Sequence, residues 1–464
     1  MDYSITMDKK NKQIQLDDNN EETSLFHAVD NIDLFSKLLT NSKIDVNQKN
    51  ENNETIFIYS CRKGKLDVVS KLILYPECDL LCIDNRGRTG LMYLVENGIC
   101  RPLYLLQKSK QFAEIDFNYR NKNNETLLSI LVKQYYEVWT RKNDAMKDER
   151  LKDLTMVYKA LLDLGCDFNS TIDEEGNTIM NFFLMVDDLP SAFYLISNYK
   201  DIDISIKNKD GISASFLSLF ITQKYQLFDL KHSLMNHKTF DHFYIDSNNN
   251  SLLIHSLVRG NKDYFIRLSC DIINSLKFLN QTNNKKENVV IIAVKLGRFN
   301  YISERIINKF DLDQQDELGN TALHYAIKLR DEYAINRLCF YHANKDLKNH
   351  QEKTPLDLLM DQENNEDYDN DRIINIIKNP LSPGKFIAEK NSNSSINPFR
   401  IKTTDEKVNK YVKNYQIEQY KKEYEDLFVR PYSPYASLLE KMTMKWNSLY
   451  IIQQDTIPRF KFKY

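Results

Sequence analysis

Short apolar stretches separated by polar turns run through most of this chain, and their spacing is typical of paired short helices. Asn52, Asn53 and Glu54 suit a turn, because asparagine tolerates left-handed backbone. Thr55 can cap a helix by accepting a backbone N–H, and Gly64 can end it with a positive φ. Two apolar helix faces follow from residue 56 onwards: Ile56, Phe57, Ile58 and Cys61, then Leu66, Val68, Val69, Leu72 and Ile73.

This pattern of turn, capping residue and two apolar faces recurs along the chain. With the capping residue as the marker, successive intervals are 32, 34, 37, 52, 35, 38, 37, 33 and 33 residues. The ten markers, which number repeats 1 to 10 below, are Thr23, Thr55, Thr89, Thr126, Thr178, Ser213, Ser251, Asn288, Thr321 and Thr354. So regular an interval predicts a solenoid, in which each unit buries its apolar faces only against its neighbours.

Three stretches carry a family resemblance. Residues 319–326 (Gly-Asn-Thr-Ala-Leu-His-Tyr-Ala) and 353–359 resemble the T-P-L-H-x-A signature that opens an ankyrin repeat. Residues 161–169 resemble the family's L-L-x-x-G-A-D-x-N ending of the second helix. The resemblance implies an all-α ankyrin-repeat solenoid of stacked helix-turn-helix units with a mostly helical C-terminal extension. It also implies that His324 serves the hydrogen bonding of neighbouring turns.

Four segments follow from the pattern. We expect a polar N-terminal segment at residues 1–20, the ankyrin array at 21–379, a linker at 380–403 and a basic, aromatic-rich extension at 404–464. The run Leu381–Gly384 contains proline and glycine and breaks the array, and the run Asn391–Ser395 has the composition of a flexible linker.

The extension itself predicts a helix from about Thr404. A stripe of Val408, Tyr411, Val412 and Tyr415 continues in a shifted register through Tyr420, Tyr424, Leu427 and Phe428, flanked by lysines. Three roles stay open: a helix that folds back over the last repeat, a docking helix for a partner, and a basic contact with acidic lipids. An apolar-rich stretch at 438–452 and an alternating, strand-like run at 460–464 follow.

Two insertions interrupt the spacing. The long interval in repeat 4 contains residues 141–150, which read either as an extended helix or solvated loop, or as a partner-specific protrusion. The second insertion, residues 224–243, carries His232, His237 and His242. Because these histidines are five residues apart, they do not share a helix face as zinc-binding pairs do, and we expect no metal there.

Composition and charge restrict the setting. The chain lacks an apolar run near the roughly 18 residues that span a bilayer, and its start lacks a secretory leader pattern. The seven cysteines are odd in number and scattered, so we expect reduced thiols in a cytoplasmic or nuclear setting. Residues 381–464 hold 15 basic and 9 acidic residues; since the whole chain carries −2, residues 1–380 carry −8.

The sequence offers little chemistry. Cys78 and Cys82 have half of a zinc-like spacing, but no second pair follows, and buried repeat cysteines are the favoured interpretation. His324 has no nucleophile beside it, and no glycine-rich phosphate loop occurs. We therefore expect no enzyme, no cofactor and no metal, and nucleic acid is not an expected partner.

The family resemblance implies recognition of a protein by the turns and first helices. The predicted function is a non-enzymatic adaptor or scaffold that binds a protein on its concave surface. The alternative is a regulator of membrane trafficking or signalling whose basic tail contacts an acidic membrane surface or a second protein. Candidate contact residues, chosen by position, are Arg86, Arg88, Asn123, Asn124, Glu174, Glu175, Lys209, Asp210, Glu317 and Lys348.

Overall fold

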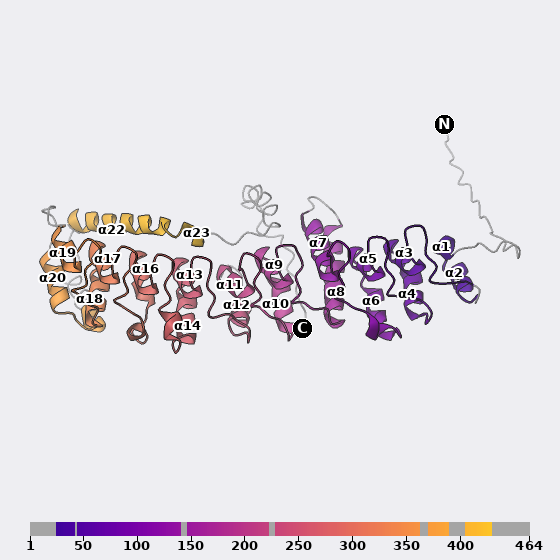
Figure 1. The fold of residues 1–464 in the computed structure, drawn as a ribbon, viewed down its shortest axis with the longest axis horizontal. Helices are drawn as coiled ribbons and strands as arrows, with labels where there is room; N and C mark the ends of the chain where they lie inside the picture. The colour runs from indigo at the N-terminus through magenta and orange to yellow at the C-terminus, as the bar shows by residue number, and fades with distance from the viewer. Residues whose placement is uncertain are drawn as a thin grey trace, which may run out of the picture. The chain divides into compact units, whose positions relative to one another are not determined.

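The computed structural model describes residues 25–41, 44–140, 146–221, 228–361, 370–388 and 404–428. Two compact units divide the chain at residue 173. Each unit is a stack of short helix pairs, and the first helix of each pair lies beside the first helix of the next (Figure 1). The predicted all-α solenoid is confirmed within each unit. None of the described helices is long and apolar enough to cross a membrane.

Unit 1 contains repeats 1 to 4. Its helices are α1 (Leu25–Ala28) and α2 (Ile32–Leu39), α3 (Ile56–Arg62) and α4 (Leu66–Leu74), α5 (Gly90–Glu96) and α6 (Arg101–Leu105), and α7 (Leu127–Thr140) and α8 (Lys147–Asp163), with 3-10 turns η1 (Leu106–Lys108) and η2 (Phe112–Glu114) after α6.

Unit 2 contains repeats 5 to 10. Repeats 5 and 6 hold α9 (Ile179–Met185), α10 (Leu189–Asn198), α11 (Ala214–Leu217), η3 (Ser218–Phe220) and α12 (Phe228–Met235). Repeats 7 and 8 hold α13 (Leu252–Val258), α14 (Lys262–Asp271), α15 (Leu276–Leu279), α16 (Val289–Lys295), η4 (Phe299–Tyr301) and η5 (Ile307–Lys309). Repeats 9 and 10 hold α17 (Ala322–Lys328), α18 (Glu332–Phe340), α19 (Pro355–Met360) and α20 (Asn370–Lys378); α22 (Thr404–Lys422) and α23 (Glu425–Phe428) follow.

The marker residues cap the first helices, as predicted. In eight repeats the marker side chain accepts a hydrogen bond from the amide three residues later, at 3.0 to 3.4 Å. Each such cap satisfies an amide that the helix cannot, which contributes about 1 kcal/mol. In repeat 9, Thr321 forms a capping box with His324 instead. Thr23, the first marker, lies outside the described residues.

A second recurring residue shapes the turns. Five residues before the cap, an asparagine or aspartate Oδ1 accepts hydrogen bonds from the amides two and four residues later. These residues are Asn50, Asp84, Asn121, Asn208, Asp246, Asn283, Asp316 and Asn349. The turn that they hold presents a backbone N–H to the preceding turn: Asn284 N donates to Asn248 O, and Glu317 N to Lys285 O.

Apolar side chains of the first helices form the core between the stacked repeats. All seven residues of α9 and of α16 are buried. Helix α16, for example, packs between α13 and α17. Of the predicted second face in repeat 2, Val68, Val69, Leu72 and Ile73 are buried. Leu66 is 40% exposed, so its assignment to that face was wrong; it is the first residue of α4 and lies at the open end of the helix.

The insertion in repeat 4 lengthens both helices of the pair. Helix α7 runs to Thr140 and α8 starts at Lys147, so the extended-helix interpretation of residues 141–150 agrees with the described part. Arg150 of α8 donates to the carbonyls of Glu96 and Asn97 at the end of α5. The first turn of α8 therefore supplies donors to carbonyls at the C-terminal end of α5, the first helix of the preceding repeat.

The array also extends into the segment predicted as a linker. Residues 383–388 are helical, and Phe386 is 7% exposed. Asn336 exchanges two hydrogen bonds of 2.8 Å with the backbone of Leu381. The predicted strand at 460–464 and the polar segment at 1–20 lie outside the described residues.

Repeat 8 replaces its second helix with the turns η4 and η5, and a buried arginine compensates. Arg337 of α18 is 1% exposed and donates to Ile302 O at 2.9 Å and to Phe299 O at 3.4 Å. Its guanidinium also stacks 5.0 Å from the Phe299 ring centroid. The Phe299 carbonyl also accepts from the Ile302 amide at 3.2 Å, so Ile302 O is the carbonyl that depends on the next repeat for its donor.

We expect Arg337→Met to lower the free energy of unfolding by about 1–3 kcal/mol, because it leaves the Ile302 carbonyl without its donor. Urea unfolding of the full chain followed by circular dichroism measures this. Arg305→Met, at an exposed position of repeat 8, is the control. Equal effects of the two substitutions would contradict the role assigned to Arg337.

His324 links repeats 9 and 10, as the family resemblance implies. Its Nδ1 accepts from the Thr321 amide at 3.1 Å, and its Nε2 lies 3.1 Å from Lys353 O. A carbonyl can only accept, so Nε2 carries the proton and the ring is neutral. Burial lowers the pKa of His324 below its ordinary value, although the Lys353 carbonyl opposes that shift.

A lowered pKa makes this contribution dependent on pH. The unfolded chain takes up the proton first as pH falls below about 6.5, so the stability that His324 provides is present above that pH and is lost below it. We expect the stability difference between the wild type and His324→Gln to shrink between about pH 7.5 and pH 5. Urea unfolding at each pH measures it, with His350→Gln at an exposed position as the control. A difference independent of pH would refute the prediction.

Candidate functional site

The C-terminal helices α22 and α23 lie along the first helices of unit 2 (Figure 1). Lys413 of α22 pairs with Asp331 at the start of α18, Tyr420 meets α17, and α23 contacts α13. The predicted helix from Thr404 is confirmed, and its fold-back onto the array matches one of the three open roles. It differs from a cap on the last repeat, because its contacts run backward over repeats 9, 8 and 7.

An ion cluster joins α22 to repeat 8; its array members are buried, and Glu423 of the tail is exposed. Lys295, at the end of α16, lies 2.7 Å from Glu287 Oε1 and 2.5 Å from Glu423 Oε2. Lys295 and Glu287 are 3% and 1% exposed. The Tyr424 hydroxyl donates to Glu287 Oε1 at 3.0 Å, and Asn283 Nδ2 donates to Glu287 Oε2 at 2.8 Å. We call Glu287, Lys295, Glu423 and Tyr424 the repeat-8 cluster.

Three tyrosines surround the ammonium group of that cluster. Lys295 Nζ lies 5.1 Å from the ring centroid of Tyr325, 4.9 Å from that of Tyr420 and 5.6 Å from that of Tyr424. Tyr325 comes from the array and the other two from the tail. Aromatic faces attract a cation most when water is excluded, so the tail rings strengthen the hold on Lys295.

The protonation states follow from this environment. Burial alone lowers the pKa of Lys295, but Glu287 and Glu423 outweigh it and raise the pKa above its ordinary value. Burial, together with Glu287, raises the pKa of Tyr424 well above the ordinary value. Lysine therefore stays charged and tyrosine stays a donor, which is the state that the hydrogen bonds require.

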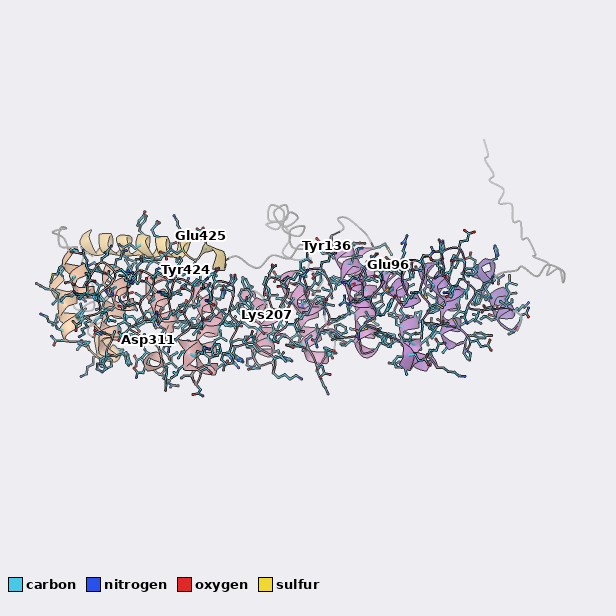
Figure 2. The ribbon with its side chains drawn as sticks, in the orientation of Figure 1. Glu96, Tyr136, Lys207, Asp311, Tyr424 and Glu425 are labelled. Atoms are coloured by element: carbon cyan, nitrogen blue, oxygen red, sulfur yellow. The ribbon has the colours of Figure 1, made fainter. Side chains whose placement is uncertain are left out.

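The remaining tail contacts are few. Lys413 Nζ lies 2.8 Å from Asp331 Oδ2, and Lys285 Nζ lies 3.9 Å from Glu423 Oε2. A Cβ at Gly297 would come within 2.8 Å of Ile417 Cδ1, so the absence of a side chain lets Ile417 approach the array. Figure 2 shows Tyr424 on the array side of the α22–α23 junction and Glu425 on the opposite side, in keeping with their burial.

Other repeats carry the same ion pair without the tail. The residue before the cap and the residue eight positions later have opposite charges in repeats 2, 3, 4 and 10: Glu54–Arg62, Arg88–Glu96, Glu125–Lys133 and Lys353–Asp361. The spacing places both side chains on the first-helix face. In the sequence this pair is visible as opposite charges eight residues apart around these caps and that of repeat 8, but it was not among the predicted features.

The turn residues differ in their further side-chain partner. Asn208 and Asn349 donate to an asparagine Oδ1 of the preceding repeat. Where the turn residue is Asn50, Asn121 or Asn283, its amide donates to a glutamate four residues later. Where it is Asp84, Asp246 or Asp316, it meets a tyrosine or histidine nine residues later. The tyrosine hydroxyl or imidazole thus replaces the glutamate as the group that satisfies the turn.

Most residues predicted to contact a partner lie at exposed turn tips. Within unit 1, Lys122 Nζ donates to Asn85 O, so the tips of repeats 3 and 4 are adjacent. Within unit 2, Lys209 N donates to Glu175 O, which joins repeats 5 and 6. The exposed residues are Arg86, Asn123, Asn124, Glu174, Lys209, Asp210, Glu317 and Lys348, and Glu175 is half-buried.

Arg88 does not fit that expectation, because it is 7% exposed. It pairs with Glu96 at 2.9 Å and stacks 4.3 Å from the Tyr93 ring centroid. Its position directly before the cap turns its side chain onto the first-helix face, into the recurring ion pair. Arg88 therefore supports the fold of repeat 3 and is not a surface contact.

The cysteines and the histidines of the second insertion show the environment expected of structural residues. All seven cysteines are free thiols, and Cys61, Cys78, Cys166 and Cys339 are buried, as the repeat interpretation predicts. Burial raises the pKa of Cys78 to about 12. His237 Nδ1 lies 3.0 Å from Thr239 Oγ1, and His242 lies 3.5 Å from Asp271. Among the described residues, no group of three potential ligands could hold a metal ion.

The fold and this surface define a helical-repeat protein with an ordered face of turns and first helices. The family model for ankyrin repeats (3 copies) matches residues 25–121 and 242–349. The chain therefore contains ankyrin repeats. No curated protein matches it. Repeats 4 to 6 fall between the matched ranges, yet Thr126, Thr178 and Ser213 cap their first helices as in the matched repeats.

The repeat-8 cluster leads to a stability prediction. Lys295→Met leaves Glu287 buried without its cation and should cost about 3–5 kcal/mol. The double variant Glu287→Gln/Lys295→Met removes both charges and should cost less than half of that, because no buried charge remains. Urea unfolding of the full chain measures both. Lys328→Met, at the equivalent but exposed position of repeat 9, is the control; a double variant as unstable as the single one would contradict a buried pair.

Proposed function

We propose that this protein is a non-enzymatic adaptor that binds a protein partner on its turns and first helices. The observation that carries the proposal is that this surface in unit 2 already binds a helix, α22, with an ion cluster and three tyrosines. Ankyrin repeats are generally protein–protein interaction modules, and the chain contains them in both units.

The physical basis is a preformed surface. Caps and turn asparagines or aspartates hold the tips in place before a partner arrives, so little ordering entropy is lost on binding. The exposed turn residues differ in charge between repeats: Arg86 and Lys209 are basic, whereas Glu317 is acidic. Specificity would then come from the tips, while the scaffold beneath them stays the same.

The membrane alternative has less support from the described tail. Lys413 is engaged with Asp331, and Tyr420 and Tyr424 are buried against the array. An amphipathic helix that binds lipid would need those aromatic side chains at its free face. We therefore favour a protein partner, and liposome binding by the full chain, lost when the residues after Pro380 are removed, would favour the alternative.

The test compares two triple variants of the full chain. Arg86→Glu/Lys209→Glu/Lys348→Glu changes exposed turn tips, and Lys71→Glu/Lys309→Glu/Lys378→Glu makes the same charge change at exposed positions of the second elements. Proteins co-purified from the native cell after cross-linking are quantified by mass spectrometry, and direct binding is then measured with the purified partner.

We expect the tip variant to weaken binding at least tenfold and the control to leave it unchanged. The tips supply the contacts, whereas the second elements face away from the proposed surface. A partner that both variants bind as the wild type does, or one that the control loses equally, would refute the proposal.

A further inference from the structure

We propose that α22–α23 is a removable internal ligand of the surface that α13, α16 and α17 present to it, called the groove below, and that this surface recognises a partner's helix ending in a Tyr-x-x-Glu-Tyr turn. The tail and that helix would compete for one surface. This inference rests on the proposed function, because it requires a protein partner, and it adds the chemistry of that partner and a means of control.

The array side of the contact is satisfied without the tail. Glu287 pairs with Lys295 of its own repeat and accepts from Asn283. The Tyr325 hydroxyl donates to Asp316 of its own turn. Departure of α22 therefore leaves Glu287 and Lys295 paired with each other, and Asp331, which loses Lys413, keeps its hydrogen bond from the Ala334 amide. Removal of a permanent structural brace would instead leave a buried charge without a partner.

The tail side supplies a compact recognition element. At its end, α22 tightens into a turn in which Glu423, Tyr424 and Leu427 each donate a backbone N–H to the carbonyl three residues earlier. This turn directs the Glu423 carboxylate to Lys295 and the Tyr424 hydroxyl to Glu287. The carboxylate of the tail thus pairs with a basic group of the array, and the phenol of the tail donates to an acidic group of the array.

The fit of the tail is incomplete. The Tyr420 hydroxyl is buried and has no hydrogen-bond partner among the described residues, which costs free energy. A ligand joined to its site by the chain needs little intrinsic affinity, because its effective concentration is already high. A partner helix that satisfies this last hydroxyl or contacts more of the groove could displace the tail.

Lys295 makes the choice of ligand specific. An ammonium group with one array carboxylate and one array ring, Tyr325, still attracts a second carboxylate and further aromatic faces. Lys285, at the rim of the groove, adds attraction for an acidic group. A helix with basic residues at the Glu423 position would be repelled by both lysines.

The experiment uses a fluorescent peptide of residues 404–428 as the probe and the full chain as its receptor. The disarmed chain carries Glu423→Gln/Tyr424→Ala, which removes the turn's two contacts. Its matched control carries Tyr415→Ala/Glu425→Gln, the same residue types at exposed positions. Fluorescence anisotropy gives the dissociation constant of the peptide for each chain.

We expect the disarmed chain to bind the peptide at least tenfold more tightly than the wild type or the control. Adding Gly297→Ala to the disarmed chain should abolish that gain, since the methyl group meets Ile417. Adding Gly165→Ala should preserve it, because φ there is also positive but open space surrounds the position. Equal binding by all chains, or no binding by a disarmed chain that melts as the wild type does, would overturn the proposal.

Hydrogen exchange of the unaltered full chain gives a test that requires no variant. A removable ligand exchanges its α22 amides at least tenfold faster than α16 and α17 exchange theirs, whereas a fixed brace would share their protection. Equal protection would refute the inference. If α22 is as protected as α16 and α17 while the turn-tip variant still loses its partner, the removable tail is refuted and the proposed function stands. If α22 exchanges faster but the turn-tip variant binds the partner as the wild type does, the proposed function is refuted and the removable tail stands.

Discussion

The hydrogen bonds from one asparagine or aspartate side chain to two amides of its own turn are what the rest of the structure depends on. A two-helix repeat cannot bury its apolar faces alone, so its neighbour must approach in a fixed position. Asn283 and Asp316 fold their turns so that the tips meet through backbone hydrogen bonds. Without these turns, the first helices of adjacent repeats would not begin at matching positions beside each other.

That constraint explains why degenerate repeats still stack. Repeat 8 has no regular second helix, yet it keeps the turn of Asn283 and the cap of Asn288, and Arg337 from repeat 9 supplies donors for the irregular backbone. Variation is therefore tolerated at the second helix, where a neighbour can compensate. It is restricted at the turn, because each turn must match two neighbours.

Charge on the first-helix face has a second use beyond the fold. In repeats 2, 3, 4 and 10 the pair that flanks the cap is complete within its own repeat. In repeat 8 the same pair accepts a third member, Glu423, because Lys295 lies among tyrosines that exclude water. A stabilising pair and a recognition site are thus the same residues, and their environment decides which role dominates.

The sequence by itself determined the repeat, because caps, turns and apolar faces are local: Thr55, Gly64 and Val69 act within one unit. It also indicated a helix from Thr404. The burial of Arg88 follows from the recurring pair eight residues apart, a pattern that the predicted contact residues did not take into account. The sequence did not reveal that Tyr424 meets Glu287, because the separation of these two residues in the chain does not recur. Where the tail lies was decided by tertiary structure alone, since ion pairs and ring contacts depend on distance in space.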